Sequence, residues 1–361
     1  MMSMWVSNTA TAMMVFPIGL ALVDRFKNGA SASATSEANF AKALMLGIAY
    51  AASIGGVGTL IGTPPNAIFA GESRLLFPEL PEITFFSWML IGVPYAAIFL
   101  PLAWAYLSFT RMRGVVLEGL DVSIQRELTK LGRPSRGEIS VFIIFCLAVL
   151  GWLTRRDIDF GLFVMPGWSS LLGVEGVGDA TVAILAALLL FAVPVNLKRG
   201  DYVLNWEWAT KIPWGVLVLF GGGFSLAFGF QQTGLAEWLG QGLAGLTAIP
   251  LPLFILILCL LVTLFGELAS NTALAVLMIP ILGATAYEVG VHPYLFIIPA
   301  TLAASSGFML PVATPPNAIV FGSGVLKIRE MAKAGFAMNI LGALLITLIM
   351  FLVVIPLYGL R

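Results

Sequence analysis

The strongest constraint on the fold is a series of long apolar stretches, at about residues 85–110, 139–154, 179–197, 212–233, 250–265 and 334–358. A bilayer core about 30 Å thick is crossed by an α-helix of roughly 20 apolar residues, so stretches of this length predict membrane-spanning helices. Apolar side chains make up 59% of the 361 residues and charged side chains only 11%, too few for these segments to face water. We therefore expect an all-α integral membrane protein. Its formal net charge of zero excludes a broad basic surface for nucleic acid.

Two polar motifs interrupt the apolar sequence, and each occurs twice in the same order. The first is the triplet Ser7-Asn8-Thr9, which returns as Ser270-Asn271-Thr272. The second is Thr-Pro-Pro-Asn, which lies at 63–66 and again at 314–317. Duplication of both motifs in the same order indicates an internal structural repeat.

The prolines of the second motif predict two broken helices. Proline removes a backbone donor and forces the preceding residue out of the helical region, so we expect breaks at Pro64 and Pro315. Unwound backbone at membrane depth is tolerated only where it is buried in protein or lines an aqueous cavity. Polar residues at the tips of helical hairpins, together with broken helices at corresponding places in two halves, are typical of a transporter binding site near the membrane midplane. We therefore expect each triplet to lie at such a hairpin tip. The alternative is that the Ser, Asn and Thr side chains only form hydrogen bonds between packed helices. The duplication of both motifs argues against this alternative.

The distribution of basic residues predicts the orientation. Cytoplasmic segments of membrane proteins are enriched in lysine and arginine, which places the 111–138 segment inside. If the segment around Ser270 is a re-entrant hairpin that enters and leaves on the outer side, all 19 lysine and arginine residues lie inside except Arg74, Arg155, Arg156 and Arg361. The first hairpin exits beside Arg25 and therefore opens inward. The two halves then form an inverted repeat, with two re-entrant hairpins and two broken helices.

The chemistry available around the motifs favours cation-coupled anion transport. The only ionisable side chain near the triplets and the prolines is Glu267, which either binds a cation or accepts hydrogen bonds from N–H groups of the hairpin tip. An anion would therefore be held by amides, hydroxyls and the N–H groups of helix N-termini. A cation would bind the hydroxyl, amide and backbone oxygens of the same segments, and its charge would balance that of the anion. His292, directly before Pro293, is interpreted as a helix cap.

The paired motifs, together with the stretch NWEWATKIPWGVLVLFGGGFSLAFG at 205–229, resemble the divalent anion/sodium symporter family, also called the INDY family of carboxylate transporters. The resemblance covers essentially the whole chain. It implies a secondary transporter and not an enzyme, with sodium as the coupling ion and no other cofactor, in a bacterial inner or plasma membrane. The implied function is sodium-coupled symport of C4 dicarboxylates such as succinate, malate and fumarate by a homodimer.

The same resemblance implies an elevator mechanism and a division of the chain. Residues 1–110 would form the first transport-domain repeat, 111–138 a cytoplasmic connector, 139–243 the scaffold helices, and 244–361 the second transport-domain repeat. The implied substrate residues are Ser7, Asn8, Thr9, Thr63, Pro64, Ser270, Asn271, Thr272, Thr314 and Pro315. The implied sodium ligands are Ser3, Ser7, Asn8 and the Gly62 carbonyl in one site, and Gly266, Ala269, Asn271 and the Ala313 carbonyl in the other. Gly266 stands where the first copy has Ser3, so the second site lacks a hydroxyl and is expected to be the weaker one.

Several alternatives remain open at this stage. A sodium-independent dicarboxylate exchanger, or a transporter of sulfate or another divalent anion, would use the same tips. A channel would need a continuous polar path, and an enzyme would need a nucleophile–base pair or metal ligands, neither of which the motifs supply. The first triplet begins only seven residues into the sequence, whereas the apolar stretch 250–265 precedes the second. We therefore expect the functional protein to have an additional N-terminal arm.

Overall fold

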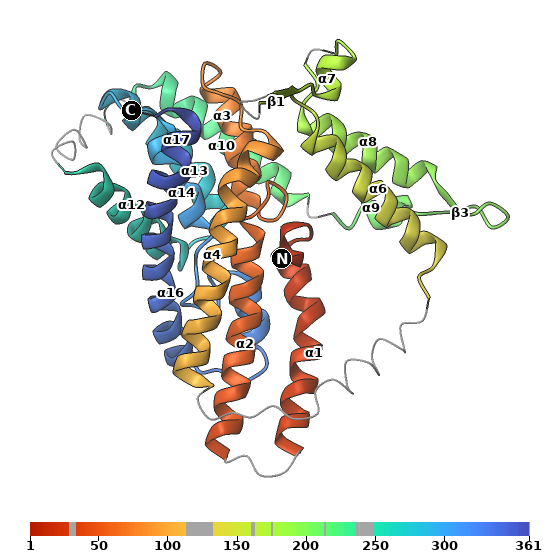
Figure 1. Ribbon diagram of the computed structural model, residues 1–361, viewed down its shortest axis with the longest axis vertical. Coiled ribbons are helices and arrows are strands. Elements are labelled where there is room, and N and C mark those ends of the chain that lie inside the picture. The colour runs from red at the N-terminus through yellow and green to blue at the C-terminus, as the bar shows by residue number, and fades with distance from the viewer. Residues whose placement is uncertain are drawn as a thin grey trace. The chain divides into compact units, whose positions relative to one another are not determined.

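A computed structural model describes residues 1–28, 34–112, 133–159, 163–174, 176–212, 214–235, 238 and 249–360. The chain forms two compact units (Figure 1). Unit 1 comprises Met1–Ile83, Ser87–Leu117 and Val216–Arg361, and unit 2 comprises Thr84–Phe86 and Glu118–Gly215. Within the described ranges, 6 helices are long and apolar enough to cross a membrane. This confirms the predicted multi-pass helical architecture.

Unit 1 repeats one order of elements. Its first half contains the short 3-10 helix η1 (Met2–Met4), α1 (Asn8–Asn28), α2 (Ala34–Gly56), α3 (Pro64–Leu76) and α4 (Phe85–Arg111). Its second half contains α12 (Leu251–Gly266), α13 (Asn271–Glu288), α14 (Tyr294–Ala304), α15 (Pro315–Phe321) and α16 (Ile328–Ile349), which continues through the π-helical turn η3 (Met350–Val354) into α17 (Ile355–Tyr358). Helix α10 (Gly215–Gln232) joins this unit from Val216 onward.

Both predicted helix breaks are present. Helix α2 ends at Gly56 and α3 begins at Pro64, and α14 ends at Ala304 and α15 begins at Pro315. Thr63 and Thr314 precede the prolines with extended backbones, at φ −143° and −141°, as the proline ring requires of the preceding residue. We call residues 57–63 the first break loop and residues 305–314 the second break loop.

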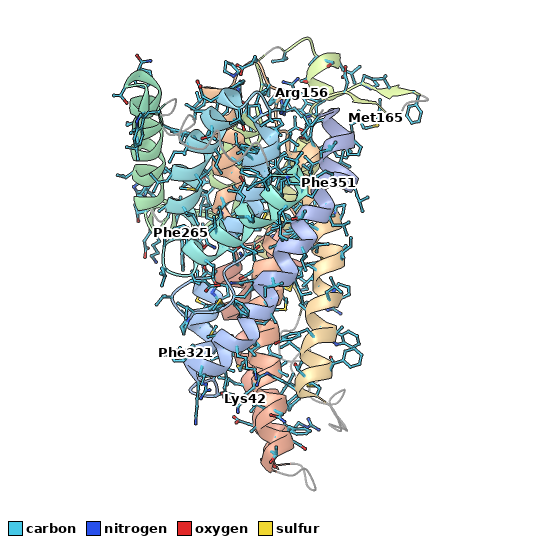
Figure 2. The ribbon with its side chains drawn as sticks, turned by 90° about the vertical axis from the view of Figure 1, so that its left-hand side faces the viewer. Lys42, Arg156, Met165, Phe265, Phe321 and Phe351 are labelled. Atoms are coloured by element: carbon cyan, nitrogen blue, oxygen red, sulfur yellow. The ribbon has the colours of Figure 1, made fainter. Side chains whose placement is uncertain are left out.

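The two broken helices run in opposite directions. Lys42, near the start of α2, forms an ion pair of 2.6 Å with Glu330 at the start of α16. Figure 2 places Lys42 at the same end of the molecule as Phe321, the last residue of α15. At the other end, the hydroxyl of Tyr294, the first residue of α14, donates to the carbonyl of Pro81 just beyond α3. We call these the basic end and the tyrosine end.

Helices α12 and α13 form a hairpin that enters and leaves at the tyrosine end. Phe254, near the start of α12, packs on Phe296 of α14 with ring centroids 4.4 Å apart. Tyr287, near the end of α13, donates to the carboxylate of Glu79 in the segment after α3. The turn at 267–270 therefore lies at the far tip of the hairpin, as the distribution of basic residues predicts.

The hairpin helices pack across the repeats. Helix α1 lies against α2 of its own half and α15 of the other, and α13 lies against α14 of its own half and α3 of the other. Aromatic side chains fill the interior: Phe308 of the second break loop meets the ring of Tyr50 edge-on at 5.2 Å and that of Phe99 at 5.7 Å. The two halves therefore share one core.

Unit 2 is built around α6 (Arg136–Leu153) and α8 (Asp179–Ala192), with the short helices α7 (Trp168–Leu171) and α9 (Trp206–Ala209). Two small antiparallel ladders, β1 (Ile158–Asp159) with β2 (Val164–Met165) and β3 (Pro194–Asn196) with β4 (Asp201–Tyr202), are the strands of the described residues. Asp179 organises the start of α8, because its carboxylate accepts from Arg155 Nε at 2.7 Å and from the Phe85 backbone N–H at 2.9 Å. A capping box joins Ser135 and Glu138 at the start of α6.

The two units do not follow the predicted boundaries throughout. The predicted scaffold at 139–243 includes α10, which groups with unit 1 from Val216 onward. Most of the predicted connector at 111–138 lies outside the described residues. The assignment of transport and scaffold roles stays a prediction.

Candidate functional site

Each Ser-Asn-Thr triplet lies at the start of a long helix. Helix α1 begins at Asn8, and α13 begins at Asn271 with Ser270 as its extended N-cap residue. The Ser7 carbonyl accepts from Thr11 N–H and the Ser270 carbonyl from Leu274 N–H, both at 2.9 Å. The N–H groups in the first turn of a helix lack partners within the helix, and its dipole favours negative charge there. Both triplets are thus placed where a carboxylate group can be held.

The first set of predicted cation ligands comes together between η1, the start of α1 and the first break loop. A Cβ atom built on Gly56 would overlap the side chain of Asn8, and one built on Gly62 would lie 2.8 Å from the Ser3 carbonyl oxygen. Ser3 Oγ and Asn8 Oδ1 are buried and have no hydrogen-bond partner among the described residues. Ser7, by contrast, is exposed, and its hydroxyl accepts from Ala10 N–H at 3.3 Å.

The second set forms a corresponding cluster at the tip of the α12–α13 hairpin. A Cβ on Gly266 would lie 3.9 Å from Asn271 Oδ1 and 3.8 Å from the Ala304 carbonyl oxygen. A Cβ on Gly307 would lie 3.5 Å from the Gly266 carbonyl oxygen and 3.1 Å from the Ala313 Cβ. Asn271 Oδ1 is also buried without a partner in the described part of the chain. Ala269 is exposed beside this cluster.

Two asparagines of the Thr-Pro-Pro-Asn motifs hold the break loops in the same way. Asn66 Nδ2 donates to the carbonyls of Val57 at 3.1 Å and Thr59 at 2.7 Å. Asn317 Nδ2 donates to the carbonyls of Gly307 at 3.3 Å and Leu310 at 3.0 Å. Both asparagine side chains are fully buried, and their Oδ1 atoms have no partner among the described residues. Sequence reasoning did not assign them a role, although their identical place in both motifs is a usable signal.

The remaining predicted substrate residues lie around these loops. Thr63 and Thr314, directly before the prolines, are each 4% exposed, and Thr314 Oγ1 accepts from Asn317 N–H at 3.4 Å. Pro64 and Pro315 are exposed, whereas Thr9 and Thr272 are half-buried in the first turns of α1 and α13.

Glu267 is a structural acceptor, which decides between the two roles that its position allows. Its carboxylate accepts from the backbone N–H groups of Phe308, Met309 and Leu310 at 2.8–3.0 Å. Asn339 of α16 adds a further hydrogen bond of 2.7 Å. The N–H donors come from the second break loop, not from the hairpin tip as the sequence suggests. Glu267 therefore fastens the hairpin tip to the loop.

A glycine of the following long helix lets each break loop lie against that helix. A Cβ on Gly92 of α4 would lie 2.5 Å from the Val57 carbonyl oxygen and 3.0 Å from Gly58 Cα. A Cβ on Gly335 of α16 would overlap the carbonyl group of Phe308 and lie 2.5 Å from Met309 Cα. Sequence reasoning missed both glycines, because nothing in their surrounding apolar sequence marks them.

The set of available ligand atoms suits a hard cation. The available atoms are hydroxyl, amide and backbone oxygens, which alkali and alkaline-earth cations accept. Among the residues that the structure describes, no group of three or more His, Cys, Asp or Glu side chains forms a metal site. The burial of unpaired oxygens is costly unless a ligand satisfies them. Each cluster therefore holds buried oxygens that the described residues leave without a hydrogen-bond partner.

His292 caps the start of α14, as predicted. Its Nδ1 accepts from Tyr294 N–H at 3.2 Å, and burial lowers the pKa of its imidazole. A lowered pKa means that the unfolded chain takes up the proton more readily than the folded one. The contribution of the neutral His292 imidazole to folding stability is therefore fully present above about pH 6.5, and it is lost as the pH drops below that value.

We expect the Tm of the detergent-purified protein to be lower at pH 5.5 than at pH 7.5 because of His292. The chain has one histidine, so few other groups titrate in this window. His292→Asn keeps an acceptor for Tyr294 N–H and does not titrate, and its Tm should change less with pH. An identical pH dependence in both proteins would contradict the assignment.

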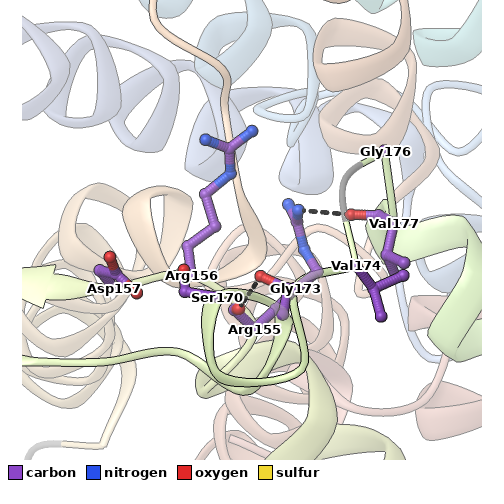
Figure 3. Close-up of a pocket in the computed structure, with 9 residues that line it drawn as sticks. Arg155, Arg156, Asp157, Ser170, Gly173, Val174, Gly176 and Val177 are labelled. Carbon is purple, nitrogen blue, oxygen red and sulfur yellow. Dashed lines mark hydrogen bonds between the residues drawn. The ribbon is translucent and has the colours of Figure 1, made fainter.

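A separate polar pocket of about 570 Å³ lies within unit 2 (Figure 3). Its charged groups are engaged with the protein: Arg155 donates to Asp179 and to the Val177 carbonyl, and Asp157 accepts from Gly167 N–H at 2.7 Å. This last hydrogen bond lowers the pKa of the Asp157 carboxyl. The pocket brings together none of the residues predicted for transport.

Two antiparallel broken helices with buried, unpaired oxygens beside each break define a secondary transporter of the membrane. The chain belongs to the family described as the sodium:sulfate symporter transmembrane region, whose model matches residues 1–360. This confirms the resemblance and the prediction of a transporter, not an enzyme.

Two similar transporters are consistent with this family. The chain is 40% identical to the sodium-dependent dicarboxylate transporter SdcS of Staphylococcus saprophyticus over 99% of its own length and 68% of the relative's. It is 41% identical to SdcS of Staphylococcus aureus strain RF122, over 98% of its length and 66% of the relative's. The chain thus spans about two thirds of the length of these relatives. The YdaH transporter of Alcanivorax borkumensis, at 15% identity and a TM-score of 0.55 over 99% of this chain and 84% of that one, is similar in fold alone.

Proposed function

We propose that the protein is a sodium-coupled symporter of C4 dicarboxylates such as succinate, malate and fumarate. The observation that carries the proposal is the burial of Asn8 Oδ1 and Asn271 Oδ1 without partners, each at the N-terminus of a long helix and beside a break loop. An asparagine side chain placed in this way offers its oxygen to a cation and its amide nitrogen to a carboxylate. The names of the SdcS relatives support sodium as the cation and a dicarboxylate as the anion.

The absence of basic side chains near the triplets explains why transport of an anion would be coupled to sodium. No lysine or arginine occurs between Met1 and Leu20 or between Leu251 and Leu326. A dianion entering between the triplets would meet helix dipoles and amides but no fixed positive charge in these segments. Sodium ions bound beside it supply that charge, so anion and cation stabilise each other. Binding of one is therefore expected to raise the affinity for the other, and equally in both directions.

The proposed ligands follow the two clusters. One sodium would lie among Ser3, Ser7, Asn8 and the Gly62 carbonyl, and the other among Gly266, Ala269, Asn271 and the Ala313 carbonyl. The substrate would contact Ser7, Asn8, Thr9, Thr63 and Pro64 in the first half, and Ser270, Asn271, Thr272, Thr314 and Pro315 in the second.

Transport would follow an elevator mechanism in a homodimer, with residues 1–110 and 244–361 carrying the substrate. The opposite directions of the broken helices support this proposal, because inverted repeats allow one site to face each side of the membrane in turn. Residues 139–243 would then supply helices of the stationary scaffold.

A sulfate transporter is the second candidate, because the family description names sulfate. The two relatives argue for a dicarboxylate instead, and a dicarboxylate has two separated carboxylate groups for two triplets. A sodium-independent exchanger would use the same tips without the cation sites.

The test is uptake of labelled succinate into proteoliposomes under an inward sodium gradient, with an equal potassium gradient as control. We expect uptake with sodium alone, competed by malate and fumarate but not by sulfate. Uptake that ignores sodium and requires internal dicarboxylate would show an exchanger. Competition by sulfate and not by malate would favour the second candidate.

A further inference from the structure

The charge of Glu267 lies beside the second cluster. The Glu267 carboxyl carbon, the Gly266 carbonyl oxygen and the Ala313 Cβ lie 3.9, 3.5 and 3.1 Å from one point, the position that a Cβ on Gly307 would occupy. Gly266 and Ala313 belong to the second sodium site under the proposed function, on which this inference rests. The carboxylate is therefore only a few ångströms from the place where that cation would bind.

The charge is also poorly neutralised. Glu267 is 3% exposed, so water screens it weakly. Among the described residues, its hydrogen-bond donors are the peptide N–H groups of the second break loop and the amide of Asn339, all of them uncharged. No lysine or arginine occurs in the sequence from 251 to 326. A buried carboxylate in such surroundings is stabilised further by a cation nearby.

In the first half, the equivalent contact with the break loop involves no charged side chain. Met4 occupies the place equivalent to Glu267, one residue after Ser3, just as Glu267 follows Gly266. There the Thr59 hydroxyl donates to the Met4 carbonyl, whereas in the second half Leu310 N–H donates to Glu267 Oε2 at 2.8 Å. The first cluster has the extra hydroxyl of Ser3, and the second has an extra negative charge.

We propose that Glu267 is the fixed countercharge of the second sodium site, and that this site binds sodium more tightly than the first. The hydrogen bonds to both carboxylate oxygens leave Glu267 acting through its charge and not as a direct ligand. The lack of a hydroxyl at Gly266 therefore does not make the second site the weaker one, as the sequence alone suggests.

The experiment measures sodium binding without transport. Sodium that binds the folded protein raises its Tm, and the sodium concentration that gives a fixed rise is proportional to the dissociation constant; we call this concentration the sodium midpoint. The detergent-purified protein is therefore titrated with sodium chloride against choline chloride, without any dicarboxylate. Glu267→Gln should raise the sodium concentration at the midpoint by at least about tenfold, as the loss of one weakly screened charge a few ångströms from the cation predicts. Glu267→Asp, which keeps the charge, should stay within about threefold of the unmodified protein.

Asn339→Leu is the matched control, because it removes a donor to Glu267 and leaves the charge in place. Its sodium midpoint should remain close to that of the unmodified protein even if its Tm is lower. The proposal is overturned if Glu267→Gln leaves the midpoint unchanged, or if Asn339→Leu and Glu267→Gln shift it equally. If Glu267→Gln does not fold, a tenfold shift in Glu267→Asp overturns the proposal. Absence of any sodium effect in the unmodified protein would instead refute sodium coupling itself.

Discussion

Asn8→Ala and Asn271→Ala should each reduce sodium-driven succinate uptake by roughly 10- to 100-fold. The estimate follows from the loss of a hydrogen bond to a charged group, which costs about 1.5–3 kcal/mol. Each asparagine starts a helix and buries an unpaired Oδ1 in one cluster, so its truncation removes a cation ligand and a substrate donor together. The measurement is initial uptake into proteoliposomes at matched protein content.

Asn39→Ala is the matched control for these variants. Asn39 lies on α2 near the basic end, away from both clusters, and the same truncation there should leave uptake unchanged. If Asn8→Ala or Asn271→Ala retains full uptake with an unaltered sodium dependence, the corresponding cluster is not a transport site.

Gly335→Ala should abolish uptake or prevent recovery of folded protein. The added methyl group would occupy the position of the Phe308 carbonyl, and backbone cannot yield as a flexible side chain does. Overpacking of this kind costs about 1–3 kcal/mol, and here it displaces the loop that Glu267 and Asn317 hold. Gly92→Ala should act in the same direction on the first break loop, with a smaller effect because its nearest contacts are longer.

Gly221→Ala in α10 is the control for both glycine variants. A Cβ at Gly221 meets nothing within 4 Å, so alanine there should be neutral or should stabilise the helix by about 0.5–1 kcal/mol. The yield of monodisperse protein, the Tm and succinate uptake are compared for all three variants. Normal folding and normal uptake in Gly335→Ala would show that the second break loop can move without consequence for transport.

Much of the architecture follows from local rules that act within the sequence. Long apolar stretches predict spanning helices because the bilayer offers no partner for an unpaired backbone. The predicted stretches at about 85–110 and 250–265 correspond to α4 (Phe85–Arg111) and α12 (Leu251–Gly266). The Pro-Pro pairs predict where α3 and α15 begin, because proline fixes φ and restricts its predecessor. The duplicated triplets identify Asn8 and Asn271, one asparagine of each cluster.

The roles of individual side chains required the tertiary structure. The sequence alone could not decide whether Glu267 binds a cation or accepts hydrogen bonds, because its donors lie about forty positions later in the chain. Gly92 and Gly335 look like ordinary helix glycines until the break loops lie against them. The two-stranded ladders of unit 2 are likewise too short for a period-2 pattern to predict.

The sequence by itself therefore determined a helical membrane transporter with two repeats, two broken helices and two polar tips, because composition, periodicity and proline chemistry act over short distances. Only the tertiary structure decided which oxygens stay unpaired, what holds each break loop, and where the one buried carboxylate of the hairpin tip places its charge. The physical reason is that hydrogen bonds, close packing and electrostatic proximity join residues far apart in the chain, and no local pattern records those distances.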